Sequence, residues 1–215
     1  MNANTATLKK AITWNMTGKM SDMASLSTSP LCNPHCQERC KNNVAVCKSC
    51  YSIRMMMRYK NLRDKLERNT EFLTTVDLAV DDVPAINRTL FRFESFGDLI
   101  NTQQVKNYFT ICEANKRTQF ALWTKNPWVI ADAMAEYGIS KPDNLIIILS
   151  SVLLNVGADP EMVAKKYPFI DKIFTVFDKE HSKDVNINCG ARSCAQCQRC
   201  YTKTDGIELV NELLK

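Results

Sequence analysis

The stretch NLIIILSS, residues 144–151, decides the fold, because a wholly apolar core of five residues ends abruptly in two serines. A short run of this kind is typical of a strand in a parallel sheet, where both faces are covered. Three other β-rich runs are TLFRFES (89–95), QFALWT (119–124) and KIFTVFD (172–178). Their starts recur every 25 to 30 residues with helical segments between them, so the chain predicts repeated β/α units.

The helices between these strands have marked ends. Asn101 is followed three residues later by a glutamine, which is a capping-box pattern. Asn126-Pro127 and Asp159-Pro160 each place a capping side chain before a proline at the first helical position. Gly138 is placed to end the second helix. These signals support right-handed crossovers between parallel strands.

Four units are half of an eightfold barrel, and 215 residues are few for a complete one. We therefore expect an α/β protein with a compact partial β/α (TIM-like) barrel; the alternative is an open parallel α/β sheet, doubly wound. The chain is predicted to be a single domain, 1–215. Its parts are an irregular Cys-rich segment (1–52), a helical segment (53–80), the β/α units (88–180), and a Cys-rich loop with a closing helix (185–215).

Polar side chains gather where the predicted strands end, which is where α/β folds place their sites. They are Glu94, Ser95, Asp98, Thr124, Lys125, Ser150, Ser151 and Asp178. If the protein is an enzyme, Glu94, Asp98 and Lys125 are the predicted catalytic groups, facing a small substrate.

Ten cysteines, five of them within residues 32–50 and four within 189–200, need an explanation. The N-terminus has no apolar run of signal-peptide length, and no stretch is long enough to span a membrane. We therefore expect a reducing cytosol, where metal binding is a better explanation for clustered cysteines than disulfides. The chain has no Gly-rich phosphate loop.

The closing motif NCGARSCAQCQRCY, residues 188–201, spaces its cysteines C-x4-C-x2-C-x2-C. Structural zinc commonly uses two separated C-x2-C pairs, whereas the run Cys194, Cys197, Cys200 resembles loops that wind around an iron–sulfur cubane. Cys189 is a plausible fourth ligand. The spacing favours a [4Fe–4S] cluster and leaves zinc and free thiols as alternatives.

The N-terminal cysteines, Cys32, Cys36, Cys40, Cys47 and Cys50, are more than one site needs, so at least one is a bystander. Cys47-x2-Cys50-Tyr51 mirrors Cys197-x2-Cys200-Tyr201. Both ends therefore serve either two similar sites or one shared site. Cys112 lies on an apolar helix face and is predicted to be buried.

A basic strip suggests a different function. Residues 37–68 hold nine Lys/Arg against three acids, which accounts for the net charge of +5. A helix predicted from Ser52 to Arg68 would carry the apolar stripe Met55, Tyr59, Leu62 and Leu66. The rival hypothesis is thus a zinc-stabilised binding module that contacts nucleic acid or an acidic host protein. A solvated helix face explains the charge better, because Asp64 and Glu67 interleave with the bases.

Five ordered motifs resemble the bacteriophage gene product 88 family over nearly the whole chain. They are S-T-S-P-L-x-N at 27–33, C-x2-C-Y at 47–51, F-R-F-x-S-F-G-D at 91–98, A-L-W-T-K-N at 121–126 and the closing cysteine motif. The resemblance implies a phage protein working in the host bacterial cytoplasm, and it carries no assigned reaction. It also implies the ligands Cys36, Cys47, Cys50, Cys194, Cys197 and Cys200, and the site-facing residues Arg92, Ser95, Gly97, Asp98, Thr124 and Lys125.

The sequence thus predicts an iron–sulfur protein with one or two [4Fe–4S] clusters and a redox or radical-type activity. Its predicted metal ligands are Cys32, Cys36, Cys47, Cys50, Cys189, Cys194, Cys197 and Cys200. The predicted cofactor-binding residues are Arg92, Ser95 and Thr124. The predicted partner is a small-molecule substrate or a host protein; nucleic acid is less favoured, and no membrane is expected.

Overall fold

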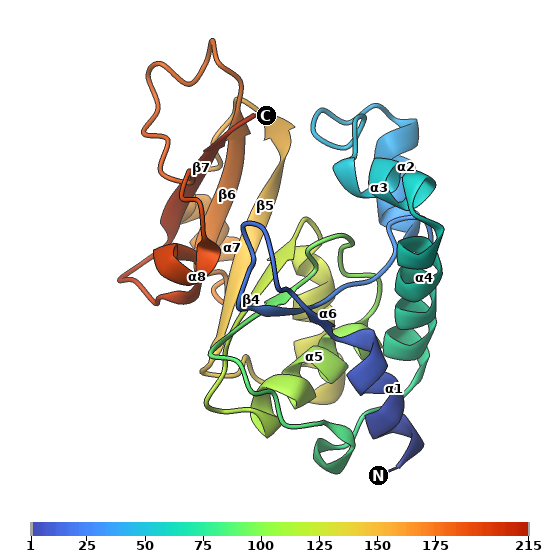
Figure 1. Ribbon diagram of the computed structural model, residues 1–215. Coiled ribbons are helices and arrows are strands. Elements are labelled where there is room, and N and C mark those ends of the chain that lie inside the picture. The colour runs from blue at the N-terminus through green and yellow to red at the C-terminus, as the bar shows by residue number, and fades with distance from the viewer. Residues whose placement is uncertain (1, 215) are drawn as a thin grey trace.

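The computed structural model describes residues 2–214 and shows a mixed α/β fold on one seven-stranded sheet (Figure 1). The strands cross the sheet in chain order, from β1 at one edge to β7 at the other. β1 is antiparallel to β2, and every later pair is parallel. The strands are β1 (Thr13–Trp14), β2 (Ala24–Leu26), β3 (Leu90–Phe93), β4 (Gln119–Thr124), β5 (Leu145–Leu154), β6 (Lys172–Phe177) and β7 (Glu208–Leu213).

The helices connect these strands. They are α1 (Ala3–Ala11), α2 (Pro34–Lys41), α3 (Tyr51–Arg58), α4 (Lys60–Thr75), α5 (Thr102–Ala114), α6 (Pro127–Tyr137), α7 (Pro160–Lys166) and α8 (Cys194–Cys197), with the 3₁₀ helices η1 (Val80–Asp82) and η2 (Arg199–Tyr201). α5 packs against both α4 and α6. Together with α1 these three helices bury one face of the sheet in the main hydrophobic core, which includes Cys112 as predicted. No helix within residues 2–214 is long and apolar enough to cross a membrane.

The apolar run in β5 is buried on both faces, as its composition predicts. Leu145 and Ile147 pack in the main core on the helix side. Ile146 and Ile148 face the other way and pack in a second core with Tyr201 of the C-terminal Cys-rich loop. Two layers therefore cover the sheet, helices on one side and this loop on part of the other.

The β/α units predicted for residues 88–180 are confirmed, and the sheet is open because β1 and β7 do not pair within the described residues. An open, mostly parallel α/β sheet is therefore correct as the fold class. The doubly wound arrangement is wrong, because in such a sheet the strand order reverses at the middle, whereas here it follows the chain.

The predicted closing helix is wrong. Residues 208–213 form β7, which pairs in parallel with the whole length of β6. The apolar residues fit helical spacing, but this pairing satisfies the backbone of β6 and buries Val210 completely. Tertiary context outweighs the local helical pattern here.

The first third of the chain is more ordered than expected. The segment 1–52, predicted to be irregular, contains α1, β1, β2 and α2. The single helix predicted from Ser52 to Arg68 is two helices, because Tyr59 takes the extended values φ −119 and ψ 97 between α3 and α4. Leu66 of the predicted stripe is buried, but Tyr59 is exposed, and Met56 is the buried methionine of α3.

Most predicted helix caps are confirmed. The side chain of Asn101 accepts a hydrogen bond from the backbone N–H of Gln104, and Asp159 caps α7. Gly138 ends α6 in the left-handed conformation at φ 63. Asn126 makes no side-chain cap, because its side chain donates instead to the carbonyl of Leu99.

Candidate metal and ligand site

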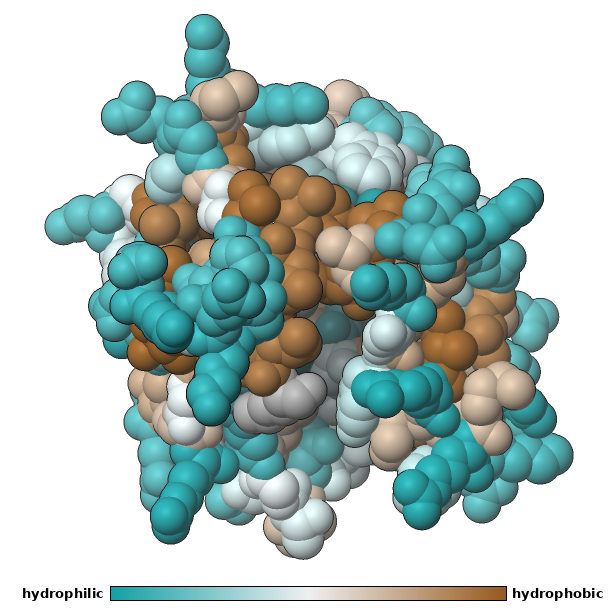
Figure 2. Space-filling view, turned by 90° about the horizontal axis from the view of Figure 1, so that it is seen from above, coloured by the Kyte–Doolittle hydropathy of each residue, from teal (hydrophilic) through white to brown (hydrophobic). Residues whose placement is uncertain are grey.

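A cavity of about 610 Å³ lies on the sheet face opposite the helices, toward the carboxyl ends of the strands. Eight cysteines line it, four from each Cys-rich segment. We call Cys36, Cys40, Cys47 and Cys50 the N-terminal thiol set, and Cys189, Cys194, Cys197 and Cys200 the C-terminal thiol set. The view onto this end of the molecule shows hydrophobic side chains gathered around a hollow (Figure 2). The two Cys-rich ends therefore meet at one cavity, as the sequence symmetry suggested.

The N-terminal thiol set is built on α2 and the turn that follows. Asn33 caps this helix by accepting hydrogen bonds from the N–H groups of residues 35 and 36. It also donates to the carbonyls of Asp98 and Leu99, at 3.0 and 3.2 Å, which ties the helix to the loop after β3. Cys36 and Cys40 are four residues apart, so they lie on the same helix face.

Arg39, between those two cysteines, attaches the N-terminal thiol set to the strand ends. Its guanidinium lies 3.6 Å from the carboxylate of Asp98. The same group donates to the side chain of Asn126 and to the carbonyl of Lys125, and it stands 5.8 Å from the ring centre of Trp128. No residue of α2 is fully buried. Polar contacts, rather than apolar packing, therefore hold this segment in place.

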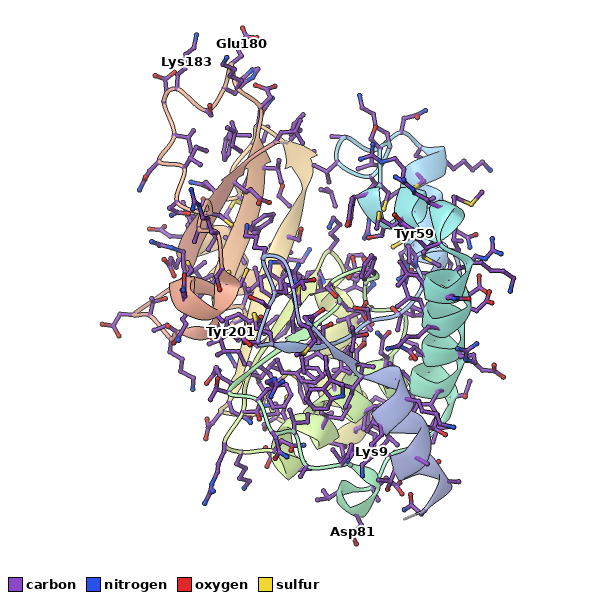
Figure 3. The ribbon with its side chains drawn as sticks, in the orientation of Figure 1. Lys9, Tyr59, Asp81, Glu180, Lys183 and Tyr201 are labelled. Atoms are coloured by element: carbon purple, nitrogen blue, oxygen red, sulfur yellow. The ribbon has the colours of Figure 1, made fainter. Side chains whose placement is uncertain are left out.

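The C-terminal thiol set is held differently. Cys189 forms a parallel bridge with Glu212 of β7, and Ser193 caps the short helix α8. Cys194 and Cys200 pack against the second hydrophobic core. Tyr201, which directly follows Cys200, points from the loop toward the sheet (Figure 3) and is only 5% exposed.

Burial raises the pKa of most of these thiols, in the N-terminal set those of Cys36, Cys40 and Cys47. In the C-terminal set it raises those of Cys189, Cys194 and Cys200, the last to about 12. Thiols within a set also raise one another's pKa, as Cys50 does for Cys47 and Cys197 does for Cys194. A bound cation would reverse the tendency, because metal binding removes the thiol protons.

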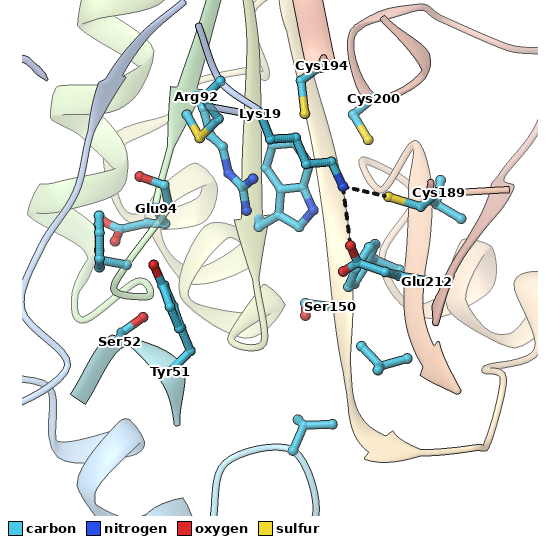
Figure 4. Close-up of a pocket in the computed structure, with 18 of the residues that line it drawn as sticks. Lys19, Tyr51, Ser52, Arg92, Glu94, Ser150, Cys189, Cys194, Cys200 and Glu212 are labelled. Atoms are coloured by element: carbon cyan, nitrogen blue, oxygen red, sulfur yellow. Dashed lines mark hydrogen bonds and ion pairs between the residues drawn. The ribbon is translucent and has the colours of Figure 1, made fainter. Parts of the chain in front are cut away.

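Each thiol set has two cations that favour thiolates. Arg39 and Lys125 lower the pKa of Cys36 and Cys47 against the effect of burial. Lys19 and Arg92 do the same for Cys194. The Lys19 ammonium is 3.6 Å from the sulfur of Cys189 (Figure 4). The two sets thus have matching chemistry: four thiols and two positive charges each.

All ten cysteines are free thiols. Within residues 2–214, no three or more His, Cys, Asp or Glu side chains lie close enough together to hold one metal ion.

Glu94 lies at the base of the cavity in a strained backbone conformation, φ 54, directly after β3. Its carboxylate accepts hydrogen bonds from Tyr108, from Gln104 at 2.7 Å and from Thr28. Burial raises the pKa of Glu94 to about 7, although these donors lower it. A carboxyl with this pKa can hold or release a proton near neutrality. A Cβ at Gly97 would lie 2.5 Å from the carbonyl of Thr28, so only glycine fits beside this network.

Asp98 organises the ends of β3 and β4. Its carboxylate accepts a hydrogen bond from the hydroxyl of Thr124 at 2.6 Å and from the backbone N–H of Lys125 at 3.0 Å. The ammonium of Lys125 donates to the hydroxyl of Ser150, within β5, at 3.0 Å. The Asp98 carboxylate is therefore used in hydrogen bonds that hold the strand ends together. The side chain of Lys125 lines the cavity.

Arg92 projects from β3 into the cavity with its guanidinium 3.9 Å from the ring centre of Trp123. Ser95 also lines the cavity and shares a 2.9 Å hydrogen bond with Ser27. Thr124 does not line it; its hydroxyl donates to Asp98 and accepts from the backbone N–H of Asn126. The structure thus brings Arg92, Glu94, Ser95, Asp98 and Lys125 to one place, as the strand ends predicted.

One predicted ligand lies elsewhere. Cys32 is exposed and faces a separate groove beside α4, so its position does not support a role with the thiol sets. Cys40, which was left out of the predicted ligands, lines the cavity instead. The signal was available, because Asn33-Pro34 starts a helix on which Cys36 and Cys40 are one turn apart. Lys19 and Arg39 had no local signal, since their contacts come from distant segments.

The fold and the cavity define a class: an open, mostly parallel α/β protein with a cavity beside the sheet that eight thiols line. The chain belongs to the family described as Gene product 88, whose match spans residues 1–210 and includes both thiol sets. The family resemblance drawn from the sequence motifs is therefore confirmed. No curated protein and no solved structure matches the chain.

Proposed function

We propose that the protein is an iron–sulfur protein in which each thiol set holds a [4Fe–4S] cluster. The observation that carries this proposal is the grouping of eight cysteines into two local sets of four around one cavity. Sequence spacing left open whether the two ends share a site. The two sets lie on different segments, one on α2 and the turn after it and the other on the loop that carries α8, and this placement supports two sites.

The fold supports a position at the rim of a barrel-like core. Six parallel strands in chain order, with helices on one face, have the connectivity of part of a β/α barrel. In that architecture the carboxyl ends of the strands carry the chemistry. The thiol sets and the polar strand-end residues lie at this end.

A bound cluster would supply single-electron transfer, and the protein residues around it would supply charge and protons. Lys19, beside Cys194, and Arg39, beside Cys47, would offset part of the negative charge of cluster-bound thiolates. Glu94 can hold a proton at its carboxylate near neutral pH. Redox or radical-type activity on a small substrate in the cavity is the function that we propose.

The test is anaerobic purification, followed by absorption spectroscopy and by iron and sulfide analysis. We expect broad visible absorption and about eight irons per chain, four for each cubane. Cys50→Ser and Cys200→Ser should each remove about half of the iron, whereas the matched control Cys32→Ser should keep all of it. Loss of all iron in either single variant would indicate one shared cluster.

A colourless protein with stoichiometric zinc would overturn the proposal and favour the rival function, a zinc-stabilised binding module. That rival draws on the exposed bases of α3 and α4, which include Arg54, Arg58 and Arg68. Binding of the full chain to duplex DNA that weakens steeply with salt would support the rival.

A further inference from the structure

Two cations in the cavity wall have no acidic partner. Arg92 and Lys125 form no ion pair within residues 2–214. The other cations near the cavity are neutralised: Lys19 by Glu212, Arg39 by Asp98 and Arg199 by Glu208. A charge that is partly removed from water without a counter-charge is costly, so these two groups call for an anion.

The carboxylates of the cavity do not supply the negative charge that Arg92 and Lys125 lack. Glu94 is held by Tyr108, Gln104 and Thr28. Asp98 receives hydrogen bonds from Thr124 and from two backbone N–H groups. Both acids are already neutralised or satisfied by fixed donors.

Contacts with neighbouring side chains hold both cations in place at the cavity wall. Arg92 lines the cavity (Figure 4), and its guanidinium lies 3.9 Å from the ring centre of Trp123. Lys125 donates one of its three N–H bonds to Ser150, so two donors are left. Arg92 lies on β3 and Lys125 directly follows the neighbouring parallel strand β4, and both line the cavity.

Part of the remaining wall is apolar and suits the organic part of a ligand. Phe174 and Val176 of β6 line one side. Tyr51 and Phe96, stacked at 6.3 Å between ring centres, line another. Inorganic phosphate alone would leave these surfaces uncovered.

We propose that the cavity binds a small organic anion, whose carboxylate or phosphate group is held between Arg92 and Lys125. The assignment of this ligand as the substrate rests on the proposed function, because the ligand lies between the two thiol sets. Its anionic group forms charge-assisted hydrogen bonds with the guanidinium and the ammonium. Its apolar part contacts the rings of Tyr51 and Phe96.

The experiment is equilibrium dialysis of the anaerobically purified full chain with three probes: phenylacetate, phenyl phosphate and neutral phenylacetamide. We expect one of the two anions to bind and the amide not to bind, and the better anion identifies the group. Arg92→Gln and Lys125→Met should each weaken binding about 10- to 100-fold, the range for a hydrogen bond to a charged group. Iron content is measured on every sample.

The matched control is Arg88→Gln. Arg88 also lies over an indole, that of Trp14 at 5.6 Å, but outside the cavity. Equal binding of the three probes, or equal weakening by Arg88→Gln, overturns the proposal. Loss of iron in Arg92→Gln and Lys125→Met also overturns it, because the cations then serve the clusters. Anion binding by a protein without iron supports the anion site and refutes the clusters instead.

Discussion

The two Cys-x2-Cys-Tyr motifs are alike in sequence and opposite in environment. Tyr201, which closes the C-terminal motif, is 5% exposed and packs in the second hydrophobic core with Ile146 and Ile148. Tyr51, which closes the N-terminal motif, is 57% exposed and stacks only on Phe96. One thiol set is thus fastened by apolar burial, whereas the other depends on polar contacts.

This difference shows that the two sets can contribute differently to stability even if they hold the same cofactor. The C-terminal set lies on the sheet and completes its second face, so it belongs to the core. The N-terminal set reaches the sheet through Arg39 and Asn33. Segments with few buried apolar contacts open at lower free energy, so the N-terminal set is the expected mobile wall of the cavity.

The largest expected effect comes from removing the apolar fastening. Tyr201→Ala should lower the free energy of unfolding by about 3–5 kcal/mol, the range for a buried aromatic side chain. Chemical denaturation measures it. The control is Tyr201→Phe, which should cost little because the buried hydroxyl has no hydrogen-bond partner. Equal losses for both variants would contradict the packing account.

The next effect concerns the base of the N-terminal segment, where Glu94 holds Thr28. Burial raises the pKa of Glu94 from 4.5 to about 7, so the folded state keeps a proton that the unfolded state releases in this window. Stability from this group is therefore lost as pH rises from about 4.5 to about 7, by about 3 kcal/mol. The difference in unfolding free energy between wild type and Glu94→Gln isolates the effect, and a pH-independent difference would refute it.

Removing the polar fastening is expected to have a smaller, more local effect. Arg39→Met deletes the hydrogen bonds and the ion pair that join α2 to the strand ends. We expect a loss of about 1.5–3 kcal/mol, as for hydrogen bonds to a charged group. Hydrogen exchange should quicken across residues 34–50 and stay unchanged across 188–201. Equal acceleration in both segments would show that the two thiol sets open together.

The sequence predicted the parts of the fold that depend on local patterns. The apolar run in β5 and the cap at Asn101 identified the β/α units. Both signals depend on residues that are close together in the sequence. It failed for β7, since only the long-range pairing with β6 makes residues 208–213 a strand. It also failed at Tyr59, where one extended residue divides a continuous helical pattern.

For the site, strand-end logic brought Glu94, Asp98 and Lys125 to the cavity, because the carboxyl ends of parallel strands share one edge. Cysteine spacing found seven of the eight thiols but chose Cys32 over Cys40. Spacing alone carries no information on which side of a helix faces the sheet. The charge partners Lys19 and Arg39 were missed because they meet the thiols only through tertiary contacts.

The smallest effects are expected from the corresponding substitutions in the opposite thiol sets. Tyr51→Ala is the counterpart of Tyr201→Ala, and Lys19→Met is the counterpart of Arg39→Met. Tyr51 buries less than half of its ring, and the ion pair of Lys19 with Glu212 is partly solvated. Each should therefore change the free energy of unfolding by less than about 1 kcal/mol. If Tyr51→Ala cost as much as Tyr201→Ala, the exposed tyrosine would have a partner in solution, and the contrast between the motifs would fail. If Lys19→Met cost as much as Arg39→Met, charge would hold both thiol sets equally, and apolar burial would not be what separates them.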